Sequence, residues 1–139
     1  MDVNDPASVQ RLIDDQITMY DVMAYSAPHD MVAREWTNGF TLTRQAADML
    51  LNGNGGVHTI PAMFLALMAG HPDTFIAKKF DEATAEQVMY KAREVLDGRR
   101  GLAEFDEECI SAGINPGSLA DICIAGIFTA LLEGWKWDC

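Results

Sequence analysis

The sequence predicts an all-α fold, an antiparallel bundle of about six or seven helices with short connections. Apolar residues recur at intervals of three and four, helix start and stop signals bracket these periodic segments, and no segment alternates as a strand would. Of the 139 residues, 49% are hydrophobic, which is enough for one compact core. We therefore expect a single helical domain over residues 1–139.

The first half of the chain predicts two long helices. Apolar residues from Ala7 to Ala24 follow the spacing of an amphipathic helix. A second helix begins at Asp30, a good N-cap residue, and is expected to bury five apolar side chains: Met31, Val32, Trp36, Phe40 and Leu50. The glycine-rich segment from Asn52 to Gly56 ends this helix.

The second half predicts shorter helices. A helix that is apolar nearly all round starts after Thr59, with Pro61 in its first turn, so it should lie at the centre. Asp73 begins another helix, and the next one has acidic residues first and basic residues late. The last helix begins at Asn115 with Pro116 in its first position. Glycines mark the ends of four helices: Gly70, Gly98, Gly113 and Gly134.

Composition excludes several classes of protein. The net charge of −11 argues against a protein that coats nucleic acid or an anionic membrane, because both need a basic face. Cys109, Cys123 and Cys139 are widely separated, so neither a disulfide framework nor a zinc site is indicated. The acidic first residues and the short apolar runs predict neither a signal peptide nor a membrane span. We expect a soluble, cytoplasmic protein.

The segment INPGSLAD, residues 114–121, admits two interpretations. Its small residues leave the first amides of a helix approachable, and Ser118 adds a hydroxyl, so this end could bind phosphate. Asp121 lies one turn deeper on the face of Ser118, where a carboxylate could hold a metal ion or accept a proton. Asn-Pro is also a routine helix start, and capping alone would explain it.

Two further clusters combine opposite charges. In HPDTFIAKKF, residues 71–80, Asp73 stands at a helix start and is followed by Lys78 and Lys79 in a chain with only ten basic residues. In HDMVARE, residues 29–35, Asp30 and Arg34 are spaced to pair on one helix face. Ordinary surface charge is the alternative for both clusters.

Taken together and in order, these three clusters resemble the C-terminal half of the triphosphoribosyl-dephospho-CoA synthase family. The resemblance extends from Asp30 to Gly134. It implies an all-helical transferase that joins dephospho-CoA to the ribose of ATP and releases adenine. It further implies ATP as substrate, Mg²⁺ with the triphosphate, and either a partner subunit or a homo-oligomer.

The resemblance also implies roles for residues at the matching positions. Asp121 and Asp73 become the candidate catalytic carboxylates, either of which could also bind Mg²⁺. Seven residues are expected to bind substrate: Asp30, Arg34, Lys78, Lys79, Asn115, Gly117 and Ser118.

The chain departs from the family in length, because family members are about twice as long and carry an Ala-His-x-Asp-Met motif in the half that has no counterpart here. Asp81 and Lys78 also stand where the family has glycine and arginine. The chain could therefore be one subunit of a split enzyme, pair with itself, or act without catalysis as an acidic helical interaction or scaffold protein.

Overall fold

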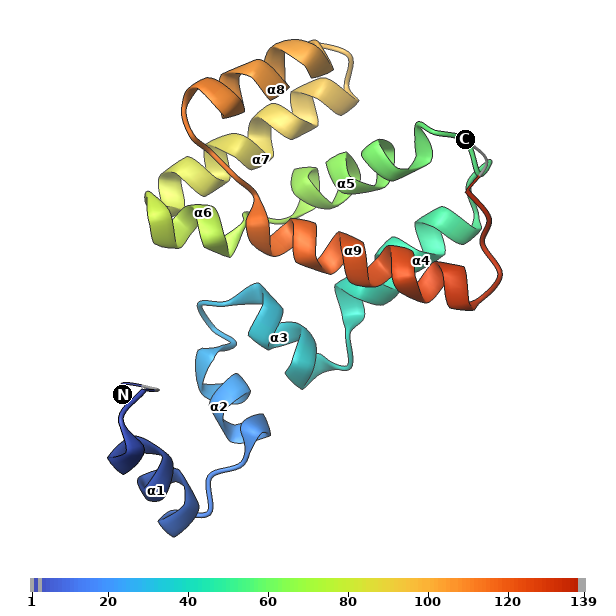
Figure 1. The fold of residues 1–139 in the computed structure, drawn as a ribbon. Coiled ribbons are helices and arrows are strands. Elements are labelled where there is room, and N and C mark those ends of the chain that lie inside the picture. The colour runs from blue at the N-terminus through green and yellow to red at the C-terminus, as the bar shows by residue number, and fades with distance from the viewer. Residues whose placement is uncertain (1, 3, 138–139) are drawn as a thin grey trace.

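The computed structural model describes Asp2 and residues 4–137, and this part of the chain forms nine helices and no strand (Figure 1). The all-α prediction is confirmed, with more helices than the six or seven expected. In chain order the helices are α1 (Pro6–Asp14), α2 (Met19–Ser26), α3 (Met31–Asn38), α4 (Thr41–Leu51), α5 (Thr59–Gly70), α6 (Thr74–Lys79), α7 (Glu82–Leu96), α8 (Leu102–Ser111) and α9 (Gly117–Leu132).

The predicted helix over residues 7–24 is two helices in the structure, so that prediction was wrong. Gln16 has a φ of 54°, which lies outside the right-handed helical region, so the helix cannot continue through this residue and α1 ends before it. Thr18 then starts α2 with a capping box, because its hydroxyl accepts from the Asp21 amide while the Asp21 carboxylate accepts from the Thr18 amide. The helical spacing of apolar residues continues across this break, and that spacing is why a single helix was predicted.

The helix predicted from Asp30 to the glycine-rich segment is also two helices. Asp30 caps α3 as expected, but Gly39 and Phe40 have φ values of 80° and 62° and turn the chain before α4. The predicted burial of two aromatic side chains was wrong as well, because Trp36 is 57% exposed and Phe40 is 43% exposed. Their rings pack on each other with centroids 5.7 Å apart.

The core lies where α9 packs along α4 and where α5 is enclosed by α4, α7 and α9. The apolar α5 is therefore central, as predicted. A glycine permits the close approach of α9 to α4: a Cβ on Gly126 would lie 2.5 Å from the Cβ of Ala46. The largest apolar side chains that are completely enclosed come from four helices: Leu50, Leu67, Ile76 and Leu119.

A buried carboxylate joins α3 to α4. Glu35 is 3% exposed, and its two carboxylate oxygens accept hydrogen bonds from the backbone amides of Leu42 and Thr43 at 3.0 and 2.9 Å. Phe40, the N-cap residue of α4, offers no side-chain hydrogen bond of its own. Glu35 therefore supplies the cap that the start of α4 lacks.

The first two helices, α1 and α2, extend from the rest of the structure as an arm (Figure 1). The arm joins the body through α2, which packs on α3. None of the helices in the part of the chain that the structure describes has the length and apolar character to span a membrane.

Candidate functional site

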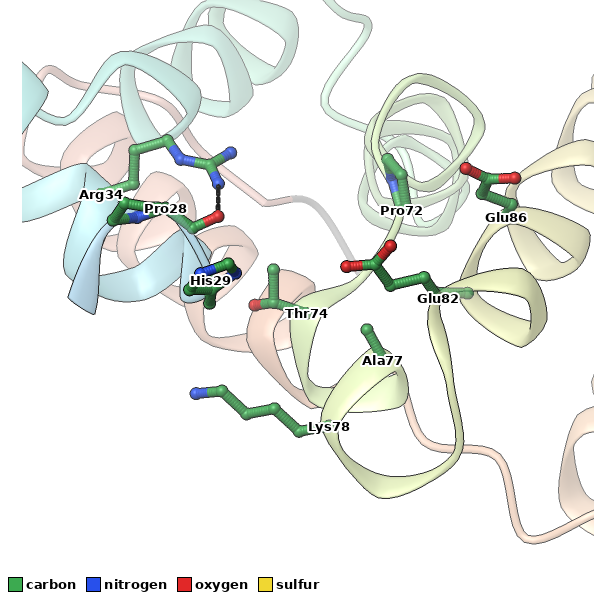
Figure 2. A pocket seen from close by; sticks show the side chains of 10 residues that line it. Pro28, His29, Arg34, Pro72, Thr74, Ala77, Lys78, Glu82 and Glu86 are labelled. Atoms are coloured by element: carbon green, nitrogen blue, oxygen red, sulfur yellow. Dashed lines mark hydrogen bonds between the residues drawn. The ribbon is translucent and has the colours of Figure 1, made fainter.

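A hollow of about 410 Å³ lies between α3, α6 and α7. Figure 2 shows Pro28, His29 and Arg34 on one side of it and Glu82 and Glu86 on the other. Pro72, Thr74, Ala77, Lys78 and Ala85 complete its lining. Side chains from two of the three sequence clusters therefore meet at one concave site, where Arg34 and Lys78 supply the positive charges and Glu82 and Glu86 of α7 supply the negative ones.

The ion pair at this hollow differs from the one that the spacing predicts. Asp30 pairs with Lys78 of α6 at 2.5 Å, not with Arg34 one turn along its own helix. The other carboxylate oxygen of Asp30 accepts from the amides of Val32 and Ala33 at the start of α3. Partial burial acts to raise the pKa of Asp30, but the bonds from Lys78 and the α3 amides outweigh it and hold the pKa below its usual range.

Arg34 is held by backbone carbonyls. Its guanidinium donates to the carbonyl oxygens of Ala27 at 3.0 Å and Pro28 at 3.2 Å, and the second bond is drawn in Figure 2. These bonds fasten the loop between α2 and α3 to α3 itself. They leave the positive charge of Arg34 at the edge of the hollow without a carboxylate partner in the described structure.

Asp73 lies in the interior, between the starts of two helices. It is 2% exposed; one carboxylate oxygen accepts from the amides of Phe75 and Ile76 in α6, and the other accepts from the amide of Leu119 in α9. Its side chain does not line the hollow, and both oxygens are engaged by the backbone. The geometry assigns Asp73 a positioning role, and its predicted catalytic role stays a prediction.

The INPGSLAD segment lies next to α6. Ser118 is buried and accepts a 3.2 Å hydrogen bond from the Thr74 hydroxyl, which in turn accepts from the Met31 amide. The helix begins at Gly117, two residues after the predicted cap. A Cβ on Gly117 would lie 3.2 Å from the ring of Phe75, so this glycine allows the two helix starts to pack closely.

The remaining predicted site residues lie apart from the hollow. Asn115 lines a second, largely apolar space of about 790 Å³ between α5 and α8. Lys79 is exposed, and its ammonium donates to the Gly113 carbonyl at 3.4 Å. Asp121 is exposed on α9, so its charge carries no cost of burial. Binding roles for these residues stay predictions.

Three residues that line the hollow were not predicted as site residues from the sequence. His29 looks like a loop residue in the sequence, and Glu82 and Glu86 look like the acidic residues that favour a helix start. Their spacing of four residues did carry a signal, because it places both carboxylates on one face of α7. The sequence contains nothing that points this face toward α3.

The acidic residues do not form a ready-made metal cage. Within the described ranges, no group of three or more His, Cys, Asp and Glu side chains is arranged to hold a metal ion. Glu82 and Glu86 are the carboxylates that line the hollow. Any ion bound there would need further ligands from a substrate or from water.

Comparison with protein families gives a match over the whole chain. The model of the ATP:dephospho-CoA triphosphoribosyl transferase family matches residues 1–139. The chain belongs to this family. The resemblance drawn from the three clusters is thereby confirmed, and ATP and dephospho-CoA are the compounds on which the family acts.

A solved structure shares the fold. A crystal structure from Archaeoglobus fulgidus, described as a triphosphoribosyl-dephospho-CoA synthase, superposes with a TM-score of 0.84 at 27% sequence identity. The match covers 97% of this chain and 61% of the Archaeoglobus chain, so this member of the family spans less than two thirds of that relative. Among curated proteins no match was found.

Proposed function

We propose that this chain binds ATP at the hollow between α3, α6 and α7. As one subunit of an active enzyme, it would transfer the triphosphoribosyl group to dephospho-CoA or a related acceptor. The observation that carries the proposal is that two cationic side chains from separate family-like clusters, Arg34 and Lys78, meet at one concave site in a chain that matches the family throughout. In this reaction the acceptor hydroxyl bonds to the ribose carbon that adenine leaves, and the hydroxyl proton must be taken up.

The positive side chains suit a polyphosphate. With a net charge of −11, the chain as a whole repels ATP, so binding requires a local cluster of cations. Arg34 and Lys78 supply two, and His29 lines the same edge. Lys78 is tied to Asp30 by an exposed ion pair, which an incoming phosphate can replace at little cost.

The carboxylates opposite suit the ribose. Breaking the bond between ribose and adenine builds positive charge on the sugar, and Glu82 or Glu86 could stabilise it or accept the acceptor's proton. Mg²⁺ ordinarily binds one or two carboxylates together with substrate phosphates, and these two side chains fit that pattern. When bound, the ion would neutralise part of the triphosphate charge.

The proposed subunit role draws on the part of the Archaeoglobus relative that residues 1–139 do not match. The Archaeoglobus relative has a further 39% of its chain beyond the matched region, given that 61% is covered. If those residues help to build its site, the site of residues 1–139 needs an equivalent contribution from outside this region. We propose that a further chain supplies it.

Nucleotide binding is tested by thermal unfolding with ATP and Mg²⁺. At 100 times its Kd, ATP should stabilise the protein by about 2.7 kcal/mol, because it binds only the folded state. The Lys78→Ala variant should lose most of this shift. Lys91→Ala is a matched control, because Lys91 of α7 also pairs with a carboxylate, Glu108 of α8, but does not line the hollow. An equal shift in wild type and Lys78→Ala would contradict ATP binding at this hollow.

A second function has a specific observation in its favour. At the start of α9, the Leu119 amide already binds the protein's own Asp73 carboxylate, so this part of the expected phosphate site is in use. This contact favours a family-derived scaffold protein that keeps the fold without catalysis. A protein that gives no ATP-dependent shift, alone or with its partner chain, would support that function instead.

A further inference from the structure

We infer that a second copy of this chain covers the apolar surface left bare by the fold, through reciprocal exchange of the α1–α2 arm. The arm of one copy would lie on the outer face of α3 and α9 of the other. This inference rests on the subunit role proposed above, and it identifies the partner subunit as a second copy of the same chain.

The arm carries large apolar side chains that remain exposed to solvent. Seven large apolar residues of this region are between 36% and 89% exposed: Val9, Ile13, Ile17, Met19, Tyr20, Val22 and Tyr25. In the described structure α1 has no sustained packing with another helix, and Figure 1 shows it standing away from the body. An isolated helix of nine residues is marginal in water, so α1 needs a packing partner to remain ordered.

A second bare surface lies on the body. Ile124, Phe128 and Leu131 recur along α9 at the spacing of one helix face, and each is at least half exposed. Leu132 continues the stripe at 73% exposure. Trp36 on α3, which contacts α9, and Phe40 at the start of α4 add an exposed aromatic pair. We call these six residues the α3–α9 face.

One symmetric contact covers both surfaces. Arm-to-arm pairing would leave the α3–α9 face bare, and pairing of two such faces would leave the arm bare. Reciprocal exchange of arms about a twofold axis covers the arm and the α3–α9 face of both copies. The same contact then forms twice, as it does in an isologous dimer.

The available area is sufficient for a stable dimer. At about 100 Å² of exposed area for each large side chain, the arm and the α3–α9 face offer on the order of 1,300 Å² per copy. If roughly half of this is covered, the total over both copies is about 1,300 Å², within the range of specific interfaces. The net charge of −11 per copy opposes the contact, so association should strengthen as salt screens the repulsion.

Sedimentation velocity of the full chain without nucleotide tests the inference. Because no ATP is present, the result does not depend on whether the proposed nucleotide binding and catalysis are correct. We expect wild type to sediment as a dimer at about 10 µM, with a larger dimer fraction at higher salt. Ile13→Glu in the arm and Phe128→Glu on the face should each raise the dimer Kd by at least about tenfold, because each buries an unpaired charge. Ile124→Glu is a second face variant.

The control substitution is Leu102→Glu, at the start of α8. Leu102 is 52% exposed, and its helix α8 lies far from the arm in Figure 1. An acidic residue is favourable in a first helical turn. This variant should stay dimeric. A monomeric wild type, or full dimerisation of either single variant, would overturn the exchange.

Discussion

The Asp73 carboxylate accepts a 2.8 Å hydrogen bond from the backbone amide of Leu119, 46 residues later in the chain. Its other oxygen caps α6 through the amides of Phe75 and Ile76. One buried side chain therefore holds the first turns of α6 and α9 together, and Lys78 reaches the hollow from the helix that Asp73 starts.

Asp73→Ala should destabilise the protein by about 2–4 kcal/mol, because it removes a helix cap and leaves the buried Leu119 amide without a partner. Urea unfolding followed by circular dichroism measures the loss. Asp81→Ala is the matched control, because Asp81 caps α7 from an exposed position through a single amide, that of Thr84. Equal losses in the two variants would show that the link to α9 contributes nothing.

Gly126→Ala should destabilise by about 1–3 kcal/mol, since the added methyl would meet Ala46 and force α9 away from α4. Gly70→Ala adds the same methyl where nothing lies within 4 Å, and it should be neutral or stabilise by about 0.4–1 kcal/mol. Comparison of the two denaturation midpoints tests the close approach. A stable Gly126→Ala would mean that the helices have room to spare.

The ion pair between Asp30 and Lys78 predicts a pH dependence. Because the folded pKa of Asp30 is lowered, its contribution to stability is fully present above its unfolded pKa of about 3.9 and is lost as pH falls through the folded value. The difference in free energy of unfolding between wild type and Asp30→Asn should therefore be constant from about pH 5 to 7 and shrink below about pH 4. Unfolding measured across this range checks it, and a constant difference down to pH 2 would contradict the lowered pKa.

Asp121→Asn should leave the free energy of unfolding unchanged, because Asp121 is exposed on α9. If the predicted catalytic role holds, turnover falls by at least about 100-fold while the denaturation curve stays in place. Retained turnover would remove Asp121 from the essential groups.

Much of the fold could be predicted because the signals are local. Asp30, Asp73 and Gly98 end or begin helices where the sequence places them, since caps act within one turn. The helix breaks at Gln16 and Phe40 were not predicted, because the helical spacing of apolar residues continues across them. Positive φ at a residue other than glycine leaves no reliable mark in a sequence.

The site was harder to predict, since its contacts join distant segments. Asp30 and Arg34 have the spacing of a pair, but Lys78 competes from 48 residues away and binds Asp30. Asp73 looks like a helix cap and is one, but its bond to Leu119 depends on how α6 meets α9. The role of residues 1–139 as a single domain matching the C-terminal half of longer relatives stays a prediction.

The most direct test is adenine release from ATP in the presence of dephospho-CoA and Mg²⁺, followed by chromatography. We predict acceptor-dependent release that the combined substitution of Glu82→Gln and Glu86→Gln lowers by at least about 100-fold, whereas Glu104→Gln, at an exposed residue on α8, leaves it unchanged. The assay should use the assembled form of the protein, with its oligomeric state measured in parallel. No adenine from an assembled protein that binds ATP, or equal release by the two variants, would contradict transfer at this hollow.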